Sequence, residues 1–292
     1  MDKLIAQFSR PFQEVLERHR QWLCVSREIR IRVGQPVLLC GEKDVRTEAF
    51  RPDAQALEEL LLSLCGGAMY ACEEQLRAGF LTLKGGHRAG VCGRMLYRDG
   101  KPLRYAEIQS LNIRIARQIP CDRRAINCAG SRDALRSVLV ISPPGMGKTT
   151  LLREMARSLS ISGVQVSVAD ERGEIAASFG GIPQLDVGPC TDVMDAMPKA
   201  EAVHRMLRTM APQVIVTDEI GSAQDAQALL EAQRSGVHIL CSAHGNGMKD
   251  VLSRPSMQIL MEGAVFDRLI VLGGAPGHIA SIYDREGKPC SG

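Results

Sequence analysis

The sequence predicts an α/β fold in which a mostly parallel sheet fills the second half of the chain and a smaller α+β domain precedes it. Two observations carry this prediction. From residue 137 onward, short apolar strands alternate with helical stretches, which is the rhythm of a parallel sheet. Before residue 110 helical and strand-like patterns are mixed, and 292 residues are enough for two domains. We therefore expect an N-terminal domain with its linker at 1–125 and a second domain at 126–292.

The composition indicates a globular protein of the cytoplasm. Apolar residues make up 45% of the chain, which can supply a sizeable core. The longest uncharged apolar stretch, residues 60–72, is shorter than the ~20 residues that cross a bilayer, and the N-terminus lacks a secretion signal. Ten cysteines are scattered without a CxxC pair, so we expect reduced, mostly buried thiols. The net charge of +3 is too small to imply nucleic-acid binding.

The first 110 residues combine helical and strand-like patterns. Apolar residues recur at helical spacing from 4 to 22, which predicts an amphipathic helix with Pro11 as a kink, packed on its own domain or lying on a membrane surface. Residues 28–34 alternate charged and apolar side chains before the apolar run 36–40, which predicts a hairpin. Further helices are expected at 55–64 and 72–78, and a second pair of strands at 80–83 and 88–97.

The second half has the pattern of a parallel sheet. Residues 118–132 carry Pro120, Gly130 and several charges without a clear period, and we place the domain linker there. The strands expected beyond it are 137–141, 164–168, 214–217, 238–242 and 269–272.

The strongest motif is the turn Ser142-Pro-Pro-Gly-Met-Gly-Lys-Thr149, which lies between an apolar strand and a helix. It departs from the phosphate-loop pattern GxxxxGK[ST] only at its first position, where Ser142 replaces glycine. Gly145 and Gly147 let the backbone curl its N–H groups around phosphate oxygens, and the helix N-terminus adds its positive dipole end. Lys148 can reach the β and γ phosphates, and Thr149 can ligate Mg²⁺. The expected nucleotide-binding residues are Pro144, Gly145, Met146, Gly147, Lys148, Thr149 and Thr150.

Two adjacent carboxylates end the strand 214–217. Asp218 and Glu219 should point to opposite sides, because strand residues alternate in direction. One can hold a water of the metal while the other polarises the attacking water. We expect Asp218 to join Thr149 at the metal and Glu219 to act on the water.

Two further strands end in polar residues at the same edge, where the ligands of α/β sheets collect. Asp170 and Glu171 follow the strand 164–168, and His244 ends the strand that begins at 238. A solitary histidine at a strand end is usually structural, but four polar strand ends in one sheet favour a role for His244 in nucleotide chemistry.

ATP with Mg²⁺ is the expected ligand. A GTP-binding protein should carry Asn/Thr-Lys-x-Asp downstream of the phosphate loop. The nearest stretch, Gly247-Met-Lys-Asp250, lacks the amide or hydroxyl at its first position.

The order of these motifs resembles the Walker A, Asp box, Walker B and His box series of the type II/IV secretion ATPases, which have a RecA-like P-loop domain. The sequence differs from this series at Asp218, because many secretion ATPases have glycine before the glutamate. Four stretches are more similar to sporulation-associated members of this family: residues 28–34, 83–94, 111–117 and 192–199.

The resemblance implies roles for individual residues. Lys148 and Thr149 would bind phosphate and Mg²⁺, Glu219 would orient water, and His244 would be a sensor that links the γ-phosphate to movement. Asp170 and Glu171 would match the Asp box, with Glu171 among the catalytic residues. Family members form hexameric rings in which N-terminal arginines approach the nucleotide. The candidates here are Arg88, Arg94, Arg114 and Arg117, although such an arginine-rich β face is more often simply solvated.

We therefore predict an ATPase that converts Mg-ATP hydrolysis into domain motion in a homohexameric ring. By resemblance, the ring would lie on the mother-cell cytoplasmic side, peripheral to the membrane, on membrane proteins of the stage III sporulation channel complex. One alternative is a nucleic-acid translocase on the same core, which the small net charge disfavours. Another is a nucleotide-gated assembly scaffold with little turnover, against which the presence of both Lys148 and Glu219 argues.

Overall fold

The computed structural model describes residues 1–47, 50–116 and 121–290, and its contacts divide the chain into two compact units. The first unit comprises Met1–Arg117 together with Ala177–Gln184, and the second comprises Gln118–Ala176 and Leu185–Gly292. The first unit is thus not a continuous segment of the sequence. The loop 177–184 belongs to it through contacts such as the backbone N–H of Gly85, which donates to Gln184 Oε1 at 3.0 Å.

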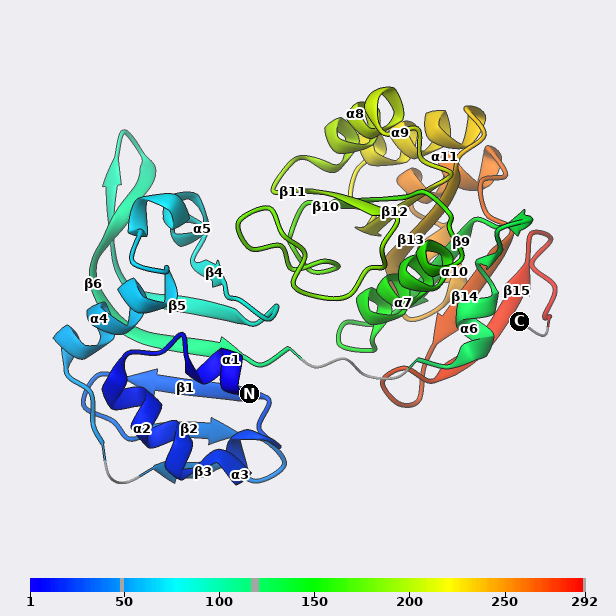
Figure 1. The fold of residues 1–292 in the computed structure, drawn as a ribbon. Coiled ribbons are helices and arrows are strands. Elements are labelled where there is room, and N and C mark those ends of the chain that lie inside the picture. Colours follow the sequence, from blue (N-terminus) through cyan, green and yellow to red (C-terminus); the bar gives the residue numbers. More distant parts are fainter. Residues whose placement is uncertain (48–49, 117–120, 291–292) are drawn as a thin grey trace. The chain divides into compact units, whose positions relative to one another are not determined.

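A six-stranded antiparallel sheet forms the first unit (Figure 1), in the order β3-β2-β1-β6-β5-β4. The predicted hairpins are confirmed as β1 with β2 and β4 with β5. Alternation in β1 buries Ile29 and Ile31 and leaves Arg32 exposed on the other face. The strands are β1 (Glu28–Arg32), β2 (Val37–Cys40), β3 (Val45–Thr47), β4 (Phe80–Thr82), β5 (Arg88–Arg98) and β6 (Lys101–Arg114).

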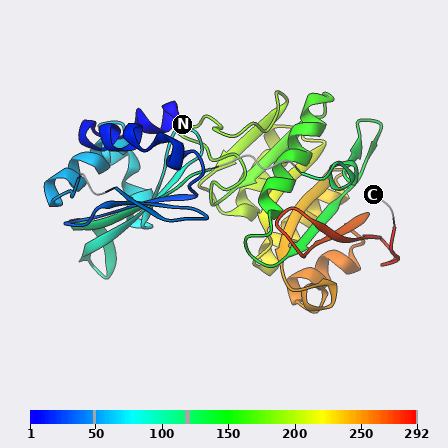
Figure 2. The same ribbon diagram turned by 90° about the horizontal axis from the view of Figure 1, so that it is seen from below.

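The N-terminal helices lie on one side of this sheet (Figure 2) and share its apolar core. The single helix predicted from 4 to 22 is wrong, because the segment forms three short helices. Pro11 is the second residue of the second helix, where its missing N–H is not needed because the first turn has no partner for it. The helices are α1 (Asp2–Ile5), α2 (Arg10–Arg18), α3 (Arg20–Leu23), α4 (Ala54–Leu64), the 3₁₀ helix η1 (Met69–Cys72) and α5 (Glu73–Arg77).

The second unit is built on a seven-stranded sheet with the order β11-β10-β12-β13-β9-β14-β15. All neighbouring strands pair in parallel except the pair formed by β14 and β15, which is antiparallel. The five predicted strands are confirmed as β9, β10, β12, β13 and β14, whereas β11 and β15 were not expected. The strands are β9 (Val138–Ser142), β10 (Val166–Asp170), β11 (Thr191–Asp195), β12 (Val214–Glu219), β13 (His238–His244), β14 (Arg268–Leu272) and β15 (Ile279–Asp284).

Helices cover both faces of this sheet, which gives three layers. On one face α7 (Lys148–Ile161) packs on alternate residues of the central strands. On the other face lie α8 (Lys199–Thr209), α9 (Ala223–Arg234) and α11 (Pro255–Glu262). Continuous apolar runs such as Val138–Ile141 are buried on both sides, as expected of a parallel sheet.

The predicted linker 118–132 is partly structured, and its residues 118–120 lie outside the described residues. It contains α6 (Arg123–Asn127), which contributes Ala125 to the core beside α7, and β7 (Gly130–Ser131), which pairs with β8 (Ala134–Leu135). The short helix α10 (Met248–Leu252) follows β13. In the part of the chain that the structure describes, no helix is long and apolar enough to cross a membrane.

Candidate functional site

The phosphate-loop turn connects the buried end of β9 to the start of α7. Gly145 and Gly147 have φ of +76° and +92°, values that favour glycine. A Cβ on Gly147 would also come within 3.4 Å of the Gly277 backbone nitrogen. Ser142 is an ordinary strand residue with no positive φ, which explains why serine replaces the usual glycine there.

This turn fits a phosphate group. The first N–H groups of α7 have no partner within the helix, and their dipoles add positive charge at the helix N-terminus. Gly147 is the N-cap, Lys148 is the first helical residue, and Thr149 and Thr150 follow in the first turn, partly buried. The residues predicted to bind nucleotide are thus contiguous around one helix N-terminus.

Lys148 is buried and held by protein groups. Its Nζ donates to the carbonyl oxygens of Ser142 at 2.8 Å and Pro143 at 3.0 Å, and to Nδ1 of His244 at 2.9 Å. Burial lowers the pKa of this lysine, and the charges of Glu219 and Glu174 oppose that shift. The ammonium therefore lies at the junction of β9, α7 and β13.

His244 connects Lys148 to Glu219. Because Lys148 donates to Nδ1, that nitrogen is the acceptor and the proton is on Nε2. His244 Nε2 lies 3.2 Å from Glu219 Oε2 and can donate to it. Three residues predicted to be catalytic thus form one chain of polar contacts across the ends of three elements.

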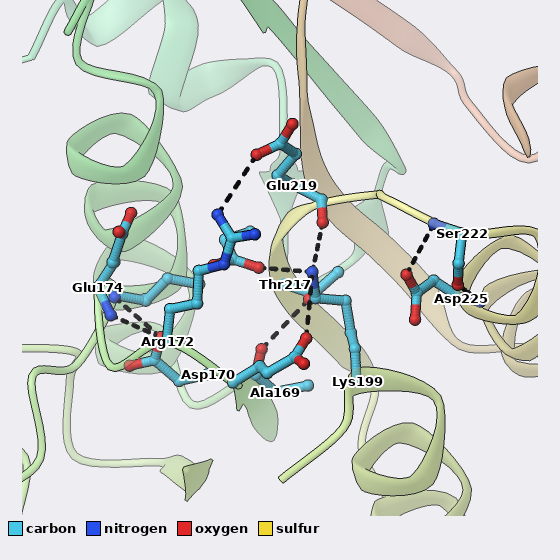
Figure 3. Close-up of polar contacts among 12 residues, drawn as sticks. Ala169, Asp170, Arg172, Glu174, Lys199, Thr217, Glu219, Ser222 and Asp225 are labelled. Carbon is cyan, nitrogen blue, oxygen red and sulfur yellow. Dashed lines mark hydrogen bonds and ion pairs between the residues drawn. The ribbon is translucent and has the colours of Figure 1, made fainter. Parts of the chain in front are cut away.

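Arg172 is a member of this site that the sequence analysis missed. Its Nη1 lies 3.7 Å from Glu219 Oε2, and the Arg172 side chain is largely exposed (Figure 3). Arg172 directly follows Asp170 and Glu171, so its position after a polar strand end was the signal that could have identified it.

The carboxylates of Asp218 and Glu219 have different partners. The buried carboxylate of Asp218 pairs with Lys199, whose Nζ lies 2.7 Å from Asp218 Oδ1. Lys199 also donates to the backbone carbonyl of Glu219 (Figure 3) and lies 3.9 Å from Glu171 Oε2. Lys199 was missed as well, because it precedes Asp218 by a whole helix and only the packing of α8 brings the two together.

Asp170 has a structural role in this arrangement. Its carboxylate accepts the backbone N–H groups of Glu174, Ile175 and Ala176 at 2.8 to 3.1 Å. Burial raises the pKa of Asp170, and these three N–H donors oppose the shift. The oxygens of Asp170 therefore fix the turn after β10, whereas the Glu171 side chain is partly exposed near Lys199.

The predicted arginines lie in the first unit. Arg114 ends β6, is largely exposed, and lies 3.7 Å from Glu28. Arg88 lies over the ring of Phe80 at 3.8 Å, and Arg94 is exposed on β5. Arg117 lies outside the described residues.

The donor set fits a magnesium ion bound together with a nucleotide. Within the described ranges, no three His, Cys, Asp or Glu residues gather closely enough to form a metal site of their own. Mg²⁺ does not need such a group, since it usually takes one or two protein oxygens besides phosphates and waters. Thr149 and Asp218 provide oxygens of this kind.

Two comparisons of sequence find similar proteins. The family model described as "Sporulation stage III, protein AA" matches residues 2–290. Stage III sporulation protein AA of Bacillus subtilis (strain 168) is 40% identical over 280 residues, covering 93% of this chain and 91% of that protein.

Two solved structures are similar in fold. The ATPase DotB of Legionella pneumophila has a TM-score of 0.60 at 16% identity and covers 95% of this chain and 82% of its own. The pilus retraction motor PilT with bound ADP also has a TM-score of 0.60 at 16% identity, covering 88% of this chain and 77% of its own. At this identity the likeness concerns the fold alone, which the chain shares with DotB and PilT.

Proposed function

The chain belongs to the Sporulation stage III, protein AA family, and from this premise we propose that it hydrolyses Mg-ATP for a sporulation-associated, secretion-like complex. One observation carries the proposal. Lys148, His244 and Glu219 form a continuous polar chain from the phosphate loop to a carboxylate at the edge of the sheet. Such a chain is useful to an enzyme that must act on a phosphate and on a water molecule at the same place.

The residues divide the work of phosphoryl transfer. The N–H groups at 144–150 and Lys148 bind the phosphates of ATP, where fixed positive groups stabilise the charge of the transition state. Glu219 orients the attacking water and accepts its proton. His244 holds Glu219 through Nε2. Because Lys148 donates to the other ring nitrogen, a phosphate that binds Lys148 competes with His244, which suits the role of a sensor.

Mg²⁺ would be held by Thr149 and, through a water, by Asp218, and it would supply the charge that neutralises phosphate oxygens. Glu171 and Arg172 lie beside the same edge, where each carries a charge that can respond to bound ATP.

We further propose that the protein works as a homohexameric ring in which hydrolysis moves the two units, and that Arg114 completes the nucleotide site. The support is the likeness in fold between this chain and the ATPase DotB, together with the exposure of Arg114. The ring would be cytoplasmic, on the mother-cell side, and peripheral to the membrane through membrane proteins of the stage III sporulation channel complex. Nucleic acid is not expected as a partner.

The test of ATP hydrolysis is Glu219→Gln in the full chain. The amide keeps the shape of the side chain but is a poor base, so turnover should fall by about 100-fold or more while ATP affinity stays near that of the wild type. Glu286→Gln, the same substitution on an exposed turn, is the matched control and should leave both unchanged. Equal turnover of Glu219→Gln and wild type would contradict the assignment.

The second candidate is a nucleotide-gated scaffold. It is favoured by the resting contacts of the site, in which Lys148 has four protein acceptors and the Glu219 carboxylate has two partners. A scaffold would bind ATP and change its assembly state with it, measured as mass in solution, although the wild type would show no turnover above that of Lys148→Ala.

A further inference from the structure

We propose that Lys199 is a positioning residue, which holds the end of β12 so that the Glu219 carboxylate faces the phosphate loop. The inference rests on the proposed ATPase function and extends it to a residue outside all the nucleotide motifs. Lys199 acts through Asp218 and the backbone of Glu219, and it does not itself touch the reacting atoms.

The placement of Lys199 is unusual for a lysine. It is the first residue of α8, with Pro198 as the N-cap, and it is buried. A cation at a helix N-terminus faces the positive end of the dipole, and a buried charge loses its hydration. Both effects act against the folded state.

Protein groups offset that cost. Lys199 Nζ lies 2.7 Å from Asp218 Oδ1 and donates to the carbonyl of Glu219, with Glu171 3.9 Å away (Figure 3). A buried ion pair of this kind often stabilises a fold no more than well-packed apolar residues would. Stability therefore does not account for a lysine at this place, whereas the position of its partners at the catalytic edge does.

The backbone of β12 shows what Lys199 holds. The pairing of β12 with β13 shifts register between Val216 and Glu219, so the strand is irregular just where its two carboxylates lie. Irregularities of this kind redirect side chains and are frequent beside active sites. Lys199 contacts both the Asp218 side chain and the Glu219 carbonyl. These two contacts hold the irregular segment in place.

The consequence appears at the carboxylate of Glu219. With its backbone held by Lys199, Glu219 directs its carboxylate to His244 Nε2 at 3.2 Å. Lys199 also offsets the negative charge of Asp218, the residue next to Glu219. Glu219 therefore keeps its carboxylate at His244, whose other ring nitrogen contacts Lys148 of the phosphate loop.

The test is Lys199→Met in the full chain, since methionine fills a similar volume without charge. We expect ATP affinity, read from a fluorescent ATP analogue, to stay within about threefold of wild type, whereas kcat falls by about tenfold or more with little change in KM. Lys199→Arg should recover part of the lost kcat. Lys288→Met removes an exposed lysine and should behave as wild type. Wild-type kcat in Lys199→Met would overturn the proposal.

A second comparison covers the case in which the single variant does not fold. Lys199→Met with Asp218→Asn removes both buried charges, and its reference is Asp218→Asn alone. Because Asp218 is also a proposed Mg²⁺ ligand, the comparison reads the ¹⁵N shifts of the His244 ring and not turnover. We expect these shifts to differ between the two variants, because the anchor on the Glu219 carbonyl is lost only in the double variant. Identical shifts would refute the positioning role.

The ¹⁵N shifts of the His244 ring separate this inference from the proposed function, because they report the Glu219 contact without any turnover. If wild type hydrolyses no ATP, the proposed function fails. The positioning role of Lys199 is still supported if Lys199→Met changes those shifts and Lys288→Met does not. It is refuted if neither variant changes them.

Discussion

At the scale of the residue, Lys148 connects the phosphate loop to the edge of the sheet. Lys148→Ala should abolish ATP binding or lower turnover by about 100-fold or more, because contacts of this kind to a transferring phosphate contribute on the order of 3 kcal/mol. Binding of a fluorescent ATP analogue and phosphate release measure the two effects separately. Unchanged values for both would exclude the turn as the nucleotide site.

Sequence could identify the site residues that belong to a short motif with a recognisable spacing. Lys148 and Glu219 came from motifs beside apolar strands, and the structure brings them together with His244. Lys199 could not be found in this way, because its contact with Asp218 depends on how α8 packs against β12. The structural role of Asp170 was also hidden, since it depends on the backbone of the turn that its carboxylate caps.

At the scale of the element, the phosphate-loop turn depends on the left-handed conformation of Gly147. Gly147→Ala should cost about 1 to 2 kcal/mol through backbone strain and should also bring a Cβ close to Gly277, so ATP affinity should fall. Gly34→Ala is the control, because Gly34 has φ of +69° but an open surrounding. Both substitutions should lower the midpoint of thermal unfolding. Only Gly147→Ala should lower the ATP affinity measured by titration.

A buried histidine makes the end of β6 sensitive to acid. Burial lowers the pKa of His87 to about 4, and its Nδ1 accepts the backbone N–H of Ala116 at 3.0 Å. The folded state thus favours the neutral ring, while the unfolded chain takes up a proton near pH 6.5. His87 contributes full stability above pH 6.5, and this contribution is lost as the pH falls from 6.5 to about 4.

The expected slope of this loss is at most about 1.4 kcal/mol per pH unit. Denaturant unfolding of wild type and His87→Gln across this pH range measures it. The difference between the two proteins should shrink as the pH falls, and a difference that is constant with pH would contradict the assignment.

Two elements differ from what the sequence predicts, each for a physical reason. β6 pairs with β5 along its whole length, but the pairing shifts register at three places, so no simple period-two pattern runs through it. The segment from 4 to 22 has the apolar spacing of a helix. Local capping and tertiary packing, which the spacing does not reveal, divide it into three. The central strands were predictable because burial on both faces demands unbroken apolar runs.

At the scale of the whole molecule, the proposed ring has a direct test. Lys148→Ala and Arg114→Ala chains should each be poor ATPases alone, since an arginine at a phosphoryl transition state can contribute on the order of 1000-fold. If subunits share the site, mixing the two chains should rebuild intact sites and recover part of the turnover. Mixing each variant with itself is the control, and a mixture no more active than its parts would count against a shared site.

The loop 177–184 gives the chain an unusual covalent path. The backbone passes from one unit to the other at 117/118, at 176/177 and again at 184/185, so three peptide connections join the units. Proteolytic cleavage at the first of these connections, 117/118, would leave the units joined by the connections at 176/177 and 184/185. A fragment starting at Ser131 would carry this loop without its hydrogen-bonding partner Gly85. The loop also begins one residue after the turn fixed by Asp170, so any displacement of that turn pulls on the first unit through the backbone itself.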